Sequence, residues 1–168
     1  MFETEIQDIF RKLEIGLSLK WDGKEAIKFM KDNGSRQWKQ MEWPGFYFQF
    51  ICERIFSEES FMQIPGPRYG KVEFDGFKNI PWDFKSHTLN SGSGSKVPTN
   101  GYVQIKQALD DYEYLGFIIV SGNAVYDKNQ QFKLWHNQLK GKISQYEKDR
   151  IARGAKSRRR KESFCVKK

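Results

Sequence analysis

Hydrophobic and polar residues alternate through residues 71–88 with a period of two, the pattern of strands that bury one face. The apolar positions are Val72, Phe74, Ile80, Trp82 and Phe84. Gly76 to Asn79 lies between the two runs and predicts the turn of a β-hairpin. The alternation therefore places four charged residues together on the opposite face of the hairpin: Glu73, Asp75, Asp83 and Lys85.

Helical spacing of apolar residues predicts two helices near the N-terminus. The first follows Thr4, a residue suited to cap a helix, and ends near Gly16. The second covers residues 24–31, after a break at residues 21–23. Neither helix carries a group of chemically active residues, so we expect residues 1–36 to serve as scaffold or as a dimerisation surface.

A third helix is predicted from Pro44 to residue 56, because proline is favoured at the first helical position. Nearly every face of this segment is apolar, which predicts a buried helix. Its few polar side chains include Gln49 and Glu53, and these need hydrogen-bond partners in the interior.

After the hairpin, helices are predicted over residues 102–114 and 130–153. Between them, residues 115–122 form a continuous apolar run bounded by glycines, which predicts a central strand buried on both faces. Residues 163–166 belong either to a solvated tail or to an edge strand of the sheet. The order of these elements predicts an α/β fold, with a mixed β-sheet flanked by helices, in a single domain over residues 1–168.

The chain carries 29 Lys and Arg residues against 21 Asp and Glu, a formal net charge of +8. This charge predicts a polyanionic partner, either nucleic acid or an anionic membrane surface. No apolar run approaches the roughly 18 residues of a membrane-spanning helix. Acidic residues stand where a secretory signal would be basic, so we expect a cytoplasmic protein. Cys52 and Cys165 show no metal-ligand or disulfide-framework spacing and are expected to be reduced thiols.

The four charged residues of the hairpin have the composition of a cation site. Directly opposed residues on paired strands lie roughly 4.5–5.5 Å apart at Cβ. Carboxylates at this separation repel each other, which raises the pKa of one of them unless a positive group lies among them. Lys85 and a divalent metal ion are the two candidates for that group. The alternative is a half-exposed sheet whose charges are simply solvated.

Asp75, followed by Asp83-Phe84-Lys85, resembles the motif of the PD-(D/E)xK nuclease superfamily, and its context resembles the small type II restriction endonucleases. Asp75 and Asp83 match the two acids of the motif and Lys85 matches its lysine, while Phe74 stands where the motif has proline. The resemblance implies a restriction-endonuclease-like fold with a catalytic hairpin. It also implies that Asp75, Asp83 and Lys85 are catalytic and that the two acids bind Mg²⁺.

The same resemblance implies an activity and partners. We expect Mg²⁺-dependent hydrolysis of phosphodiester bonds in double-stranded DNA at a specific sequence. The expected protein is a prokaryotic homodimer that binds neither a small-molecule cofactor nor a membrane. In this family the helix before the hairpin often lends one more acidic or amide group to the site. Glu53 is the first choice for that group, and Gln49 is the second.

Two segments beside the motif are candidate DNA contacts. His87 lies on the same face as Lys85 if the strand continues, which makes it a candidate phosphate contact or else a surface residue. The loop over residues 90–101 consists of small polar residues and is a candidate for ordering on DNA and contacting bases. Its possible donors are Lys96, Thr99 and Asn100.

The C-terminal tail, residues 150–168, is strongly basic. Nine Lys and Arg residues face two acids between Asp149 and Lys168. Such a density predicts phosphate contacts, with Arg158, Arg159 and Arg160 as the central run. A disordered basic arm would bind phosphate in the same way.

Two other functions are compatible with the sequence. One is a non-catalytic nucleic-acid-binding module in which the acids are surface charges and the basic tail does the binding. The other is an RNA-directed or structure-specific nuclease of the same fold. Incubation with plasmid DNA, with and without Mg²⁺, distinguishes the non-catalytic module from a nuclease. A comparison of substrates distinguishes the RNA-directed or structure-specific nuclease from a restriction enzyme.

Overall fold

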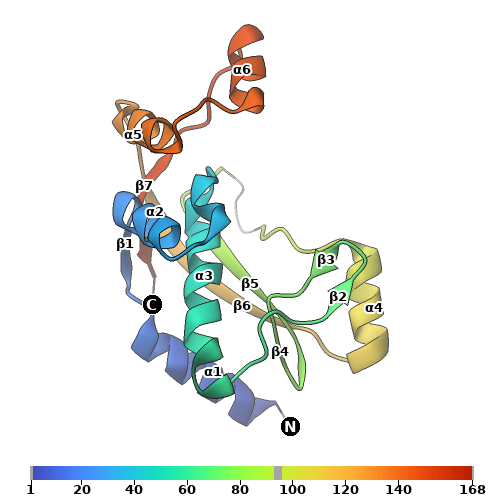
Figure 1. The fold of residues 1–168 in the computed structure, drawn as a ribbon. Helices are drawn as coiled ribbons and strands as arrows, with labels where there is room; N and C mark the ends of the chain where they lie inside the picture. The colour runs from blue at the N-terminus through green and yellow to red at the C-terminus, as the bar shows by residue number, and fades with distance from the viewer. Residues whose placement is uncertain (1, 93–95, 168) are drawn as a thin grey trace.

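A curled, five-stranded mixed β-sheet forms the centre of the molecule, as shown by the computed structural model, which describes residues 2–92 and 96–167 (Figure 1). From one edge to the other its strands are β1 (Lys20–Asp22), β7 (Lys161–Val166), β6 (Gly116–Tyr126), β5 (Ile80–Thr88) and β4 (Gly76–Lys78). Strands β5 and β6 run parallel, and the other neighbours are antiparallel. The predicted mixed α/β architecture is confirmed.

The helices of the N-terminal half are α1 (Glu3–Gly16), α2 (Gly23–Asp32), α3 (Trp43–Ser57) and the short 3₁₀ turns Arg36–Lys39 and Glu58–Ser60. Those of the C-terminal half are α4 (Tyr102–Tyr112), α5 (Gln131–Lys140) and α6 (Gln145–Ala152). The predicted cap at Thr4 is wrong, because α1 begins one residue earlier and Phe2 at its N-cap makes no side-chain capping bond. None of the helices in the described ranges is long and apolar enough to cross a membrane.

Helix α3 packs along β5 and supplies much of the core (Figure 1). Proline lies in its first turn, as predicted, and its buried side chains include Phe48, Cys52 and Phe56. The Phe56 ring lies 5.6 Å from the ring of Phe84 on β5. Full burial of one such side chain stabilises a fold by about 1.5–3 kcal/mol, so α3 fixes the position of β5.

The hairpin turn differs from the predicted one. Gly76 to Lys78 forms strand β4, paired with β5, and the chain reverses at Asn79 with φ of 57°. Asparagine tolerates this left-handed conformation, so the turn needs fewer residues than the sequence pattern suggested. The predicted first strand is a separate two-residue piece, β3 (Val72–Glu73), which pairs with β2 (Arg68–Tyr69).

Strand β6 is buried on one face only, so the prediction of a strand buried on both faces is wrong. Ile118, Val120 and Ala124 point into the core, while Phe117 is 38% and Ile119 49% exposed. Helices α2 and α3 pack against the inner face of the sheet. On the outer face α4 lies toward the β2 end, so much of that face of β6 is open (Figure 1).

The C-terminal region is more structured than the sequence indicated. The predicted helix over residues 130–153 is broken after Lys140, where Gly141 has φ of 71° and Ser144 caps α6. Strand β7 is an interior strand between β1 and β6, because its Phe164 stacks on Trp21 at 4.9 Å. Residues 161–166 are therefore neither a solvated tail nor an edge strand.

Candidate active site

The structure brings together the three residues of the sequence motif. Lys85 Nζ lies 2.9 Å from Asp83 Oδ1 on β5. Asp75 immediately precedes β4, and its Oδ2 accepts a hydrogen bond of 2.6 Å from the backbone N–H of Phe84. The pairing of Gly76 with Trp82 places Asp75 beside Asp83 across the hairpin. Both acids therefore lie on the face of β5 opposite to Phe84 and helix α3.

Glu73 does not belong to this cluster, which corrects the predicted patch of three carboxylates. Its Oε1 accepts hydrogen bonds of 3.0 and 2.7 Å from Nε and Nη2 of Arg68. The reason is the separate β2–β3 pair, in which Arg68 lies directly opposite Glu73.

Asp75 and Asp83 interact strongly with each other. The pKa of Asp75 is raised to about 7, first by burial and then by its hydrogen bond with Asp83 and the charge of Asp83, against the lowering effects of the Phe84 N–H and Lys85. Asp83 is only 3% exposed, so the alternative of simply solvated charges is wrong for this residue. Asp75 therefore keeps a proton up to about neutral pH when no additional cation lies beside it.

Asn100 completes the immediate surroundings of Asp83. Its Nδ2 donates a hydrogen bond of 3.2 Å to Asp83 Oδ2, so the two oxygens of Asp83 face Lys85 and Asn100 respectively. The sequence singled out Asn100 as a donor to bases, whereas the structure places it against a motif carboxylate. Lys96 and Thr99 in the same loop are exposed, and residues 93–95 lie outside the described residues.

Glu53 and Gln49 are paired with each other on α3, at 3.0 Å between Gln49 Nε2 and Glu53 Oε1. Burial raises the pKa of Glu53. The thiol pKa of its neighbour Cys52 is also raised, first by burial and then by the charges of Asp75 and Glu53, so this turn of α3 lies within electrostatic range of Asp75. Within the described ranges, no hydrogen bond joins Glu53 or Gln49 to either motif acid.

His87 lies two positions beyond Lys85 on the same face of β5, about 6–7 Å further along the strand. Its side chain is buried, so the alternative of an ordinary surface histidine is wrong. Its neighbour on β6 is Ser121. The strand thus presents Asp83, Lys85 and His87 in a row beside the open face of β6.

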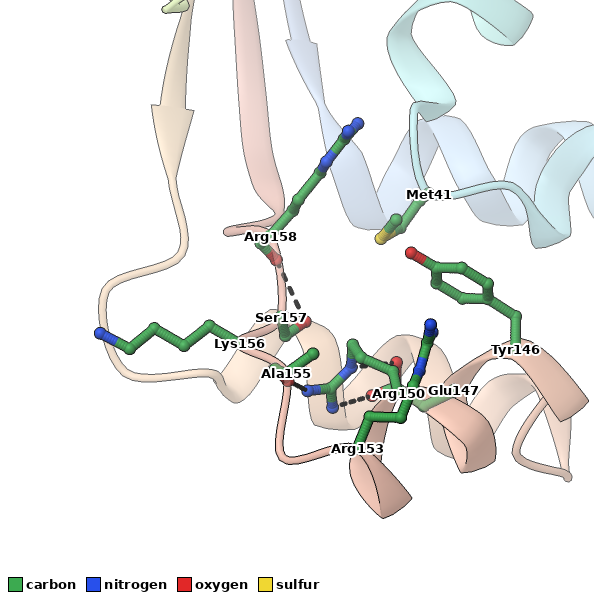
Figure 2. Close-up of a pocket in the computed structure, with 9 residues that line it drawn as sticks. All are labelled: Met41, Tyr146, Glu147, Arg150, Arg153, Ala155, Lys156, Ser157 and Arg158. Atoms are coloured by element: carbon green, nitrogen blue, oxygen red, sulfur yellow. Dashed lines mark hydrogen bonds and ion pairs between the residues drawn. The ribbon is translucent and has the colours of Figure 1, made fainter.

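The basic run near the C-terminus is divided by the fold. Arg158 and Arg159 are exposed, and the Arg159 guanidinium lies 5.1 Å from the ring centre of Tyr126. Arg160 is only 6% exposed, so the alternative of a solvated tail is wrong for this residue, and its predicted phosphate contact stays a prediction. Figure 2 shows a neighbouring hollow, in which Arg150 turns back onto Glu147 while Arg158 extends from the segment that leads into β7.

The oxygen atoms of Asp75 and Asp83 fit a hard divalent cation such as Mg²⁺, which commonly binds through one or two carboxylates and keeps several waters. The raised pKa of Asp75 indicates that an additional positive charge beside this carboxylate would be favourable. Over residues 2–92 and 96–167 there is no group of three or more His, Cys, Asp or Glu side chains arranged to hold a metal ion. Among the described residues, Asp75 and Asp83 are therefore the two carboxylates that this site provides for a metal ion.

Comparison with models of known protein families finds no match, and searches of curated proteins and of solved structures find none either.

Proposed function

We propose that this protein is a Mg²⁺-dependent endonuclease that hydrolyses double-stranded DNA, with a fold of the restriction-endonuclease type. The observation that carries the proposal is the meeting of Asp75, Asp83 and Lys85 at one point of the β4–β5 hairpin. An acid at the start of one strand and an acid-x-Lys on the next is the arrangement that the motif resemblance leads us to expect. Glu73 is bound to Arg68, and Glu53 on α3 accepts a hydrogen bond from Gln49, so the proposal rests on Asp75 and Asp83 as the carboxylates of the site.

Each motif side chain has a role that follows from its surroundings. Asp75 and Asp83 would hold Mg²⁺, which when bound lowers the pKa of a coordinated water and neutralises charge on the phosphate. Lys85 is held by Asp83 at 2.9 Å, so its ammonium is fixed where it can donate to a phosphate oxygen and orient the attacking water. The Phe84 N–H fixes one oxygen of Asp75 and so keeps that carboxylate in place.

The proposed substrate is double-stranded DNA, and the proposed assembly is a homodimer. A net charge of +8 favours a polyanion, and exposed cations such as Arg158 and Arg159 offer phosphate contacts. Cleavage of both strands at a symmetric target requires two sites, so we propose a homodimer of the type II restriction kind. His87, in the same row as Lys85, is the proposed contact to the phosphate next to the scissile bond.

The test is incubation of the purified protein with supercoiled plasmid in Mg²⁺, in Ca²⁺ and in EDTA. Discrete linear fragments in Mg²⁺, with binding but no cutting in Ca²⁺, support a site-specific metal-dependent endonuclease. Robust cleavage in EDTA would show that the reaction does not depend on a metal ion. Cleavage of RNA or of branched DNA in preference to the plasmid would assign a different nuclease substrate.

One observation favours a non-catalytic DNA-binding module as the second candidate. Both oxygens of Asp83 are already occupied, by Lys85 and by Asn100, as in a purely structural ion pair. Such a module would bind plasmid with the same affinity in Mg²⁺ and in EDTA and leave it intact.

A further inference from the structure

Arg160 has a buried guanidinium group in which two nitrogens lack hydrogen-bond partners among the described residues, while its backbone carbonyl accepts a hydrogen bond of 2.8 Å from the Asp127 N–H. It lies at the entrance to β7 and is 6% exposed. Its Nε and Nη1 are inaccessible to solvent and make no hydrogen bond within the described part of the chain. A buried group left in this state costs about 1–3 kcal/mol, and more when it is charged, so it calls for a partner.

The side chains around Arg160 carry both signs of charge: burial lowers the pKa of Arg160, Glu147, Glu42 and Asp127 raise it, and Arg150 lowers it. The pKa of Lys140 is lowered by burial and then by the charge of Arg160. The pKa of His136 is lowered to about 4 by burial and then by Lys140, with Arg160 contributing, so this imidazole is neutral at pH 7. These effects show that Arg160 and Lys140 repel each other across a partly desolvated space, and a bound anion would relieve that repulsion.

The acids nearby are largely committed to other cations. Glu147 lies 2.8 Å from Arg150 Nη2 and 3.2 Å from Lys133 Nζ, and these contacts hold its pKa down to about 2. Asp127 Oδ2 accepts a hydrogen bond from the Lys133 N–H, whereas its Oδ1 is buried without a partner. Asp127 is therefore the internal rival for Arg160, and the experiment below must separate it from an external anion.

Arg160 lines two hollows, each about 390 Å³ in volume. The first lies between the Arg36–Lys39 turn and α5 to α6, and its cations besides Arg160 are Lys39, Lys140 and Lys142. The second hollow is also lined by Lys128, Lys156 and Arg159. It adjoins the hollow of Figure 2, because Arg150 and Arg158 line both. Since a water molecule occupies about 30 Å³ of liquid, each hollow has room for a phosphate group and its water shell.

We propose that Arg160, together with Lys140 and Lys142, forms a phosphate-binding site separate from the carboxylate site. Because Nε and Nη1 are inaccessible, a phosphate in the hollow meets the guanidinium through its remaining nitrogen, Nη2, and the lysines supply mobile charge at the rim. The ligand class is a phosphate group, carried either by free phosphate or by a polynucleotide backbone.

The position of the site suits a backbone phosphate of bound DNA, and this part rests on the proposed function. Strand β6 leads from Phe117, the neighbour of Asp83, to Tyr126, the neighbour of Lys161. Nine residues of extended strand span about 30 Å. The Arg36–Lys39 side of the hollow packs on α2 and α3, whose face of the sheet is opposite to Asp83, so a backbone phosphate bound here would belong to a part of the DNA distant from the scissile bond.

The anion site is tested with inorganic phosphate alone, by calorimetry and by thermal unfolding, against chloride at equal ionic strength. Phosphate should raise the melting temperature of the wild type, because a ligand that binds only the native state stabilises it. Arg160→Gln should weaken phosphate binding at least about tenfold, as expected for loss of a charged hydrogen-bonding group. The charge-matched control is Arg11→Gln, at an exposed position of α1, and it should bind phosphate like the wild type.

Because Arg160→Gln removes a buried side chain, Lys140→Gln provides a second variant at the same hollow and should weaken phosphate binding in the same direction. No difference between phosphate and chloride in the wild type, or full binding by both variants, would overturn the site and leave Asp127 or internal water as the partner of Arg160.

DNA binding in EDTA distinguishes the two sources of phosphate. A flatter dependence of affinity on salt in Arg160→Gln, relative to Arg11→Gln, supports a backbone contact. If Arg160→Gln loses phosphate binding but keeps the same salt dependence of DNA affinity, the site does not contact the DNA backbone. Failure of the nuclease proposal would be seen separately, as absent cleavage by a protein that still binds phosphate.

Discussion

The carboxylate of Glu5 in α1 accepts a hydrogen bond of 2.9 Å from the indole nitrogen of Trp82, the residue before Asp83. Its second oxygen accepts a bond of 2.6 Å from Nδ2 of Asn79, the turn residue of the hairpin. Glu5 is buried, so one side chain of the N-terminal helix fixes both the turn and the strand that carry the motif. Helix α1 is thus part of the support of the site.

Replacing Glu5 with Ala should destabilise the protein by about 2–4 kcal/mol, because it leaves the buried Trp82 N–H and the Asn79 amide without acceptors. Cleavage should also decrease, since the hairpin loses its anchor. Urea unfolding measures the first effect, and Glu3→Ala on the exposed side of the same helix is the control. Equal stability of the two variants would show that the hairpin holds its shape without α1.

Asp83→Ala and Lys85→Ala should each abolish DNA cleavage, because each removes a group that touches the proposed metal or phosphate. Circular dichroism and DNA affinity in EDTA should remain close to those of the wild type. Glu73→Ala is the matched control, because it removes a neighbouring carboxylate that the structure assigns to Arg68. The site assignment is wrong if Asp83→Ala cuts at a near wild-type rate or if Glu73→Ala is inactive.

In metal-free buffer, Asp75 should make the protein less stable as pH rises from about 4 to about 7. Its native pKa is raised to about 7 from an ordinary 3.8, so within this window the native state holds more protons than the unfolded state. The free energy of unfolding therefore falls with pH, by at most about 1.4 kcal/mol per unit. Asp75→Asn should lack this fall, which urea titrations at several pH values will measure. Parallel pH profiles for the two proteins would contradict the coupling between Asp75 and Asp83.

His136 should act in the opposite direction. Its native pKa is lowered to about 4 from 6.5, so between these values the unfolded state holds more protons and stability is lost as pH falls. The loss should reach roughly 3 kcal/mol at pH 4. Comparison of the wild type with His136→Gln, which keeps a donor for the Trp38 carbonyl, isolates the effect from that of Asp75. Identical acid sensitivity of the two proteins would show that the imidazole is not held neutral.

The exposed arginines should contribute to DNA affinity without selecting a sequence. Replacing Arg158 and Arg159 together with Ala should reduce the slope of log K against log[salt] by up to about 1.8, which is about 0.9 for each lost phosphate contact. Affinity for all sequences should fall about equally. The double variant of Arg11 and Arg36, two exposed arginines of the N-terminal half, controls for net charge. A loss of discrimination between targets would place Arg158 or Arg159 at base edges instead.

Several features of the fold were predictable because they depend on local chemistry. Proline near the start of an apolar segment indicated where α3 begins, and alternation around Trp82 indicated a strand with one apolar face. The alternation indicated that Asp75, Asp83 and Lys85 share one face of the hairpin, but the register that brings Asp75 opposite Asp83 depends on the turn at Asn79.

The sequence by itself determined the type of several elements, the mixed α/β class and the shared face of the motif residues, because propensity and periodicity are properties of neighbouring residues. Only the tertiary structure decided where the hairpin turns (at Asn79), that Glu73 pairs with Arg68, and that Asn100 contacts Asp83. It also decided that Arg160 is buried, because β7 joins the sheet between β1 and β6 and pulls the end of the basic run inside. These outcomes depend on contacts between segments far apart in the chain, and no local pattern encodes which distant partner a charged or amide side chain will meet.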